Sequence, residues 1–208
     1  MDTTHLPLTL SFALTTLLIE LTPGPNMVWL ALLSAREGLR AGLAAALGIL
    51  CGLTVLMIAV VLGFARLVAE CPALGQAMGF VGVAFMVWLA WDAWRESNTG
   101  SWEAANDQSG EQKAFRRGFL INLLNAKAAL FFLTVFPNFI DDAHTPAPQY
   151  LVLGLIYLAI ATAIHIALAF GGETLGAYIR HKANSVTVRA GSALALLAAA
   201  AWMASKAF

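Results

Sequence analysis

Thr22-Pro23-Gly24-Pro25-Asn26 interrupts the first apolar run of the chain, which extends from about Leu6 to Leu33. Proline lacks a backbone N–H and cannot continue a helix, so a helix through this run has to break. Within lipid, unwound backbone is tolerated only where it is buried in protein or lines a polar cavity. The stretch therefore predicts a broken helix beside a cavity halfway across a membrane.

The composition is that of an integral membrane protein. Of the 208 residues, 60% are hydrophobic and 12% are charged, and the mean hydropathy is +0.76. A helix needs about 20 apolar residues to cross a hydrocarbon core of about 30 Å. We therefore predict one all-α transmembrane domain over residues 1–208 with six spans, at about Leu6–Leu33, Ala41–Ala65, Pro72–Trp94, Gly118–Ile140, Tyr150–Gly172 and Val188–Ala204. No Lys or Arg precedes the first run, so we expect it to be retained as a span rather than cleaved as a signal peptide.

The basic residues predict the orientation, because cytoplasmic loops carry an excess of Lys and Arg. Of the twelve basic residues, Arg66 and Lys206 face one side and Lys127 lies within a span. The other nine fall in loops on the opposite side: Arg36, Arg40, Arg95, Lys113, Arg116, Arg117, Arg180, Lys182 and Arg189. We expect these loops to be cytoplasmic and both termini to be periplasmic.

A polar stretch over about residues 95–116 divides the predicted spans into two groups of three. We interpret it as a cytoplasmic linker between half-repeats at about residues 1–94 and 117–208. Similar halves with three spans each insert upside down relative to each other, an architecture known in transporters. Polar residues occupy matching positions in the first span of each half, at 22–26 and 122–127. The sequence thus predicts a 3+3 inverted repeat with a broken first helix.

The backbone around the first break suits an anionic group. Pro23 and Pro25 leave the carbonyls of Ile19 and Leu21 without their helical partners. A new helix would begin near Pro25, with unpaired N–H groups and the positive end of its dipole at mid-membrane, where they favour a carboxylate. The alternative interpretation is a plain proline kink.

Lys127 and Glu20 are ionisable residues close to the predicted cavity. Lys127 lies about 15 Å along its span at 1.5 Å per residue, and a charge at that depth usually faces a partner or a wet cavity. Glu20 is the candidate partner. The pair could bind the carboxylate and ammonium of an amino acid, relay a coupling proton, or form an ion pair that only fixes helix packing.

Asn122 and Asn125 are spaced to lie near one another on a helical face, with Lys127 offset from them. Their amides suit a zwitterion or an unwound backbone, although either could be an ordinary interhelical hydrogen bond. His165, in the fifth predicted span, is a weaker candidate and is not expected to bind a metal.

Two groups of residues carry a resemblance to a known family. They are Leu21-Thr22-Pro23-Gly24-Pro25-Asn26 in the first span, and Phe115-Arg116-Arg117-Gly118-Phe119 leading into Asn122-Leu123-Leu124-Asn125-Ala126-Lys127-Ala128 and Phe136-Pro137-Asn138-Phe139. Over nearly the whole chain, the sequence resembles the lysine exporter type translocators, which include homoserine and threonine exporters. The resemblance implies a bacterial inner-membrane exporter of amino acids or close derivatives, driven by the proton gradient. Where these proteins commonly have proline, this chain has Ala126, so we expect the fourth span to be less broken than the first.

Together these observations predict a secondary active exporter and no enzymatic activity. We assign the substrate site to Thr22, Pro23, Gly24, Pro25, Asn26, Asn122, Asn125 and Lys127. Glu20 and Lys127 are the candidates for proton coupling. No nucleotide-binding signature of the Walker type is present, and we expect no cofactor, bound metal or nucleic acid partner.

Other functions fit this sequence less well. A metal cation exporter would need several oxygen ligands at mid-membrane and would disfavour a positive Lys127 beside the ion. A noncatalytic membrane assembly subunit would leave the break and Lys127 unexplained.

Three G-x-x-x-G spacings indicate close helix packing inside the molecule, or a homodimer face: Gly48/Gly52, Gly75/Gly79 and Gly172/Gly176.

Overall fold

The computed structural model of the chain describes residues 5–62, 72–95, 108–141 and 145–180, and residues 190–201 apart from 192 and 199. Secondary structure in these residues is helical throughout, which confirms the all-α prediction. The longer elements are α1 (His5–Leu21), α2 (Pro25–Glu37), α3 (Leu39–Val61), α5 (Pro72–Arg95), α6 (Gln108–Leu123) and α8 (Pro146–Arg180). After α6 come the short elements α7 (Ala126–Leu130), the π-helical η2 (Phe131–Val135) and the 3₁₀-helical η3 (Phe136–Phe139).

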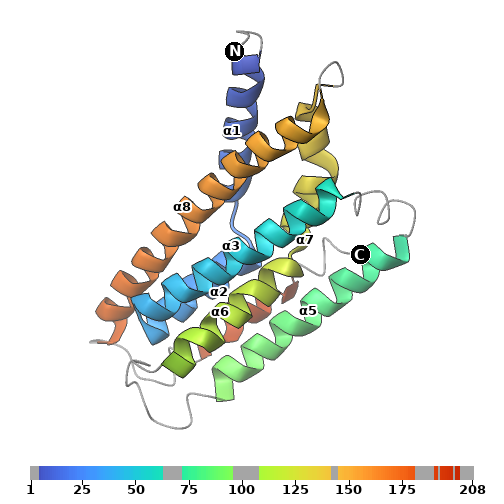
Figure 1. The fold of residues 1–208 in the computed structure, drawn as a ribbon. Helices are drawn as coiled ribbons and strands as arrows, with labels where there is room; N and C mark the ends of the chain where they lie inside the picture. The colour runs from blue at the N-terminus through green and yellow to red at the C-terminus, as the bar shows by residue number, and fades with distance from the viewer. Residues whose placement is uncertain are drawn as a thin grey trace.

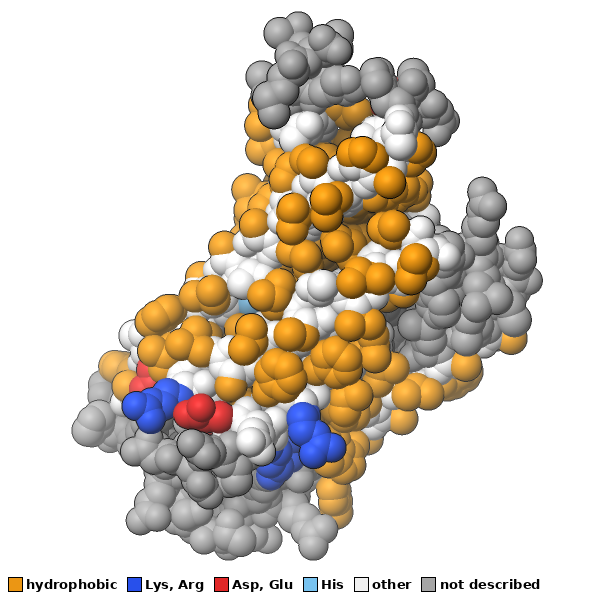
Figure 2. Space-filling view, viewed as in Figure 1, with side chains coloured by type: hydrophobic (Ala, Val, Ile, Leu, Met, Phe, Trp, Pro, Cys, Tyr) orange, Lys and Arg blue, Asp and Glu red, His pale blue; other side chains and the backbone are white. Residues whose placement is uncertain are grey.

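The helices pack around α3, which contacts α2, α6 and α8 (Figure 1). α2 also packs on α8, and α5 lies against α6. α1, which precedes α2 in the chain, contacts α8 as well. Apolar side chains cover most of the face seen in Figure 2, whereas the Lys, Arg, Asp and Glu side chains visible there gather at one end. Leu18 on α1 is 69% exposed and Phe80 on α5 is 60% exposed. Such a surface suits hydrocarbon rather than water.

Within the described residues, α3 and α8 are each long and apolar enough to cross a membrane. Two bent pairs pass the same test when each is counted as one span, α1 with α2 and α6 with the segment from Lys127 to Phe139, which makes up to four. α5 coincides with the third predicted span, and helical residues between 190 and 201 fall in the sixth. The arrangement of six spans as a 3+3 repeat is therefore not confirmed and stays a prediction.

The predicted linker over residues 95–116 is partly helical. α6 begins at Gln108, so residues 108–116 belong to a helix that continues into the second half of the chain. The rest of the linker, residues 96–107, lies outside the described residues, as do Arg66, Lys182, Arg189 and Lys206. The orientation of the termini accordingly stays a prediction.

Glycines let the helices approach closely. A Cβ atom at Gly48 of α3 would collide with the Phe115 carbonyl of α6, and one at Gly118 would collide with the Ala45 carbonyl of α3. On α8, Gly172 and Gly176 meet the backbone of α2 in the same way, where Ser34 Oγ also donates to the Ala169 carbonyl at 2.5 Å. The first and third G-x-x-x-G spacings therefore serve internal packing, and a homodimer stays untested.

Candidate functional site

The first helix break occurs where the sequence predicts it. α1 ends at Leu21 and α2 begins at Pro25, with a bend of 60° between them. Gly24 caps α2 in an extended conformation (φ −137°, ψ 170°), and Pro25 occupies the first turn. The Ile19 carbonyl was expected to lose its partner, but it accepts a hydrogen bond from the Thr22 N–H at 3.1 Å because the last turn of α1 tightens.

The second break is shorter. α6 ends at Leu123 and α7 begins at Ala126, and the bend is 45°. Asn125 caps α7, since its Oδ1 accepts a hydrogen bond from the Lys127 N–H at 3.1 Å. An asparagine cap can start a helix without a following proline. The chain therefore breaks here with Ala126 at the first helical position, and less sharply than at the first break, as expected.

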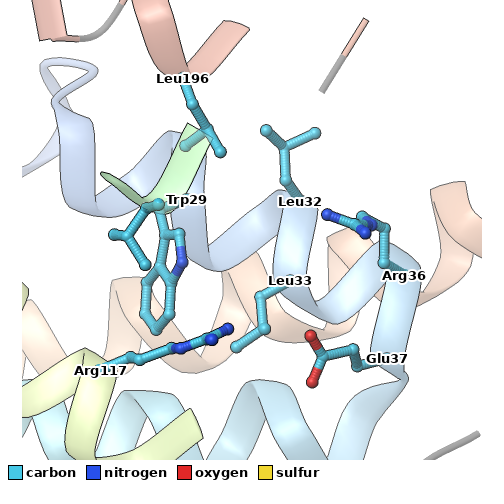
Figure 3. Close-up of a pocket in the computed structure, with 8 residues that line it drawn as sticks. Trp29, Leu32, Leu33, Arg36, Glu37, Arg117 and Leu196 are labelled. Carbon is cyan, nitrogen blue, oxygen red and sulfur yellow. The ribbon is translucent and has the colours of Figure 1, made fainter. Parts of the chain in front are cut away.

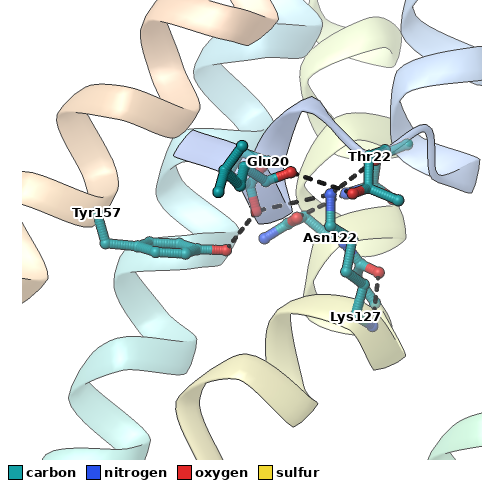
Figure 4. Close-up of polar contacts among 8 residues, drawn as sticks. Glu20, Thr22, Asn122, Lys127 and Tyr157 are labelled. Atoms are coloured by element: carbon teal, nitrogen blue, oxygen red, sulfur yellow. Dashed lines mark hydrogen bonds and ion pairs between the residues drawn. The ribbon is translucent and has the colours of Figure 1, made fainter. Parts of the chain in front are cut away.

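Lys127 connects the two breaks (Figure 4). Its Nζ donates to the Thr22 carbonyl at 3.0 Å, which satisfies a carbonyl of the unwound stretch. The same Nζ lies 3.8 Å from Glu20 Oε1, and the Tyr157 hydroxyl of α8 donates to that oxygen at 2.9 Å. The side chains of Lys127 and Glu20 are only 15% and 7% exposed. The predicted partners are thus in contact, and the structure adds a tyrosine to the pair.

Asn26 and Asn122 form a second link between the breaks. Asn26 Nδ2 donates to Asn122 Oδ1 at 2.6 Å, and both residues are buried. Asn122 Nδ2 is buried and makes no hydrogen bond to the described residues. A buried amide hydrogen without a partner is costly, so this donor is suited to a polar group of a ligand.

These polar residues line one small cavity. Its volume available to the centre of a water molecule is about 10 Å³, which is room for about one water. The lining residues are Glu20, Gly24, Asn26, Met27, Leu53, Asn122, Asn125, Lys127, Tyr157 and His165. Of the predicted site residues, Pro23 and Pro25 shape the break without lining the cavity, and Thr22 contributes its carbonyl to Lys127. Because the cavity has room for only about one water, an amino acid would enter it only after the helices move apart.

Residues 17–205 match the sequence profile of the LysE type translocators, which covers both breaks and nearly the whole chain. The chain belongs to the LysE type translocator family. As a LysE type translocator it is a membrane transporter and not an enzyme.

This LysE type translocator is similar to membrane and efflux proteins of other bacteria. An uncharacterized membrane protein of Pseudomonas aeruginosa is 32% identical over 179 residues, 83% of this chain and 82% of the relative. The homoserine/homoserine lactone efflux protein of Salmonella typhimurium is 24% identical over 170 residues, and the leucine efflux protein of Klebsiella pneumoniae is 28% identical over 174 residues. Each of these two alignments covers 82% of both chains. No solved structure matches the chain.

Tyr157 is a polar site residue of this translocator that the sequence did not predict. Its ring is fully buried and packs 4.7 Å, between ring centroids, from both Phe131 and Phe132. From the sequence alone, Tyr157 could not be distinguished from the other aromatic residues that pack in apolar helices. The signal that could have found it is its place two turns before His165 on α8, which brings both residues to the same cavity.

Proposed function

We propose that this LysE type translocator is a secondary active exporter of amino acids or small amino-acid derivatives, coupled to protons. The observation that carries the proposal is the contact between Glu20 and Lys127, one at each helix break, beside a shared cavity. Intramembrane charges are costly, and in transporters they mark the path of a substrate or a proton. The efflux proteins among its relatives support the same class of cargo.

The charges of the cavity are complementary to an α-amino acid. Lys127 and the start of α2 would receive the carboxylate, while Glu20 would receive the ammonium group. The 3.8 Å separation between Lys127 Nζ and Glu20 Oε1 is longer than the 2.7–2.9 Å or so of a charge-assisted hydrogen bond. A loosely held pair can exchange its internal partner for the cargo. Asn26 and Asn122 supply further donors and acceptors beside it.

Proton coupling would use the same residues. Tyr157, Glu20 and Lys127 form a continuous series of polar contacts from α8 to the second break. A proton taken up by Glu20 would neutralise the group that holds the ammonium, which would release the cargo and leave the empty carrier uncharged at that position. Inward proton movement would in this way drive outward movement of the amino acid.

The two breaks also support an inverted repeat in a bacterial inner membrane. Each half supplies one helix that restarts at the cavity, α2 at Pro25 and α7 at Ala126. We further propose that the charged end in Figure 2 is cytoplasmic and that both termini are periplasmic, because the cytoplasmic side carries the excess of Lys and Arg. The basic residues behind this proposal that the structure describes, such as Arg36 of α2 and Lys113 and Arg117 of α6, belong to helices rather than loops.

An efflux assay tests the proposed function. Cells that contain the protein or an empty vector are loaded with single amino acids as dipeptides, and release is followed with and without collapse of the proton gradient. We expect faster release of at least one amino acid, and loss of the difference when the gradient is collapsed. If no amino acid is released faster than from vector controls, export is excluded. If release is still accelerated after the gradient is collapsed, proton coupling is excluded but export is not.

A further inference from the structure

A second cavity is lined by the stretch of α2 that carries Arg36 and Glu37 (Figure 3). Its volume available to the centre of a water molecule is about 20 Å³, twice that of the central cavity. α2, α5, α6 and the helical residues between 190 and 201 form its walls. The lining residues are Trp29, Leu32, Leu33, Arg36, Glu37, Leu89, Arg117 and Leu196.

α2 connects this cavity to the central one. Gly24, Asn26 and Met27 line the central cavity at the start of the helix, and Arg36 and Glu37 line the second cavity at its end. The 13 residues of α2 span about 20 Å at 1.5 Å per residue. The lining of the second cavity extends back along α2 to Trp29, two residues after Met27, so the two cavities follow one another along one helix.

The second cavity combines charges of both signs with apolar walls. Arg117 is only 9% exposed, and its guanidinium lies 5.3 Å from the centroid of the Trp88 ring. Figure 3 shows Arg117 of α6 and Glu37 of α2 reaching toward each other from opposite sides, with Leu33 between them. Arg117 already interacts with another group of the protein, as expected for a guanidinium buried this far, and its planar fork also matches a carboxylate.

We propose that this second cavity is a binding site for the cargo, occupied before the central cavity during export. Arg117, assisted by Arg36, would receive the carboxylate of an amino acid, and Glu37 would receive its ammonium group. Trp29 and Leu33 would contact the side chain. The inference rests on the proposed export function, and it adds a site to the one at the helix breaks.

Binding at this site would exchange partners rather than fill vacant positions. Arg36, Glu37 and Arg117 each already interact with other groups of the protein, so an amino acid that binds them would loosen contacts which close this end. Both ends of α2 are bounded by glycine. Gly38, at φ +90°, joins it directly to α3, and Gly24 lies in the break. Movement of α2 at these two positions would widen one cavity or the other.

The test uses inverted membrane vesicles, in which the cytoplasmic face is accessible to the added amino acid. Uptake of an amino acid identified by the efflux assay, such as L-leucine, is compared with uptake of its amide, which lacks the carboxylate. For Arg117→Gln we expect KM for the amino acid to rise about tenfold or more, the effect of losing a charged hydrogen bond, with kcat little changed. KM for the amide should not change, and Arg117→Lys should restore part of the affinity.

Arg116→Gln is the matched control, because Arg116 is the neighbouring residue of the same charge and is exposed. It should leave KM unchanged. Glu37→Gln keeps the buried Arg117 and should also raise KM for the amino acid. This variant therefore tests the site even if Arg117→Gln fails to fold.

Three results would overturn the second site. The first is an unchanged KM in both Arg117→Gln and Glu37→Gln, and the second is an equal rise in KM for the amino acid and its amide. The third is a wild-type KM that rises as much as that of Arg117→Gln in vesicles without anionic lipid, which would assign the cavity to a lipid headgroup. Absence of uptake by the wild-type protein would instead contradict the proposed export function.

Discussion

Replacing Lys127 by methionine tests whether the ion pair between the breaks does more than hold them together. Methionine has a similar unbranched shape, but it removes the hydrogen bond from Nζ to the Thr22 carbonyl at 3.0 Å and the contact with Glu20 at 3.8 Å. In this variant Glu20, a residue that is 6% exposed as a whole, keeps the hydrogen bond from Tyr157 but loses the positive charge beside it. The companion variant Glu20→Gln removes the negative charge and keeps an oxygen that can accept from Tyr157.

The expected losses of stability follow from these contacts. Removing one partner of a buried ion pair costs about 3–5 kcal/mol. Because Lys127 is partly exposed and Glu20 can take up a proton, we expect about 2–3 kcal/mol for Lys127→Met. Glu20→Gln leaves Lys127 its bond to Thr22, so we expect about 1–2 kcal/mol. The double variant leaves no uncompensated charge and should be less unstable than the sum of the two by about 1–2 kcal/mol.

Two measurements on the same three variants separate the roles of the pair. Unfolding in detergent gives the stability, and release from dipeptide-loaded cells gives the export rate. We expect the double variant to be about as stable as Lys127→Met despite its second substitution, because the two losses are not additive. Its export should stay at least about a hundredfold below wild type, the effect of removing charged contacts worth about 3 kcal/mol to the transported state. Wild-type export by the double variant would refute the reasoning, because the pair would then be a packing element that neither the cargo nor the proton requires.

Three further predictions test the surroundings of the pair. Tyr157→Phe keeps the ring packing and removes the hydrogen bond to Glu20, so stability should fall by about 1 kcal/mol and the pH dependence of export should change; an unaltered pH profile would remove the hydroxyl from the relay. Gly48→Ala, whose Cβ collides with α6, should destabilise the protein by about 1–3 kcal/mol in detergent unfolding. Gly171→Ala should not, because its Cβ would meet no atom of another helix within 4 Å among the described residues. Changing both prolines of the first break to alanine should favour a continuous helix and slow export, and unchanged export and cargo affinity would contradict a broken-helix site.

Much of the site could be predicted because it depends on local chemistry. Proline cannot donate a backbone hydrogen bond wherever it stands, so the break at residues 22–24 and the start of α2 at Pro25 follow from the sequence. The depth of Lys127 required a partner, and Glu20 was the carboxylate at the matching depth. The division into spans was less secure, since hydropathy does not show that α6 extends back to Gln108 through polar residues.

The sequence by itself determined the membrane environment, the family resemblance and the first helix break, because composition and the missing N–H groups of Pro23 and Pro25 act whatever the neighbours are. Only the tertiary structure decided what surrounds the breaks. Tyr157 reaches Glu20 from 137 residues away, and Asn26 finds Asn122 across 96. Such contacts depend on which helices pack together, and helix periodicity along one segment carries no information about which distant helix will face it.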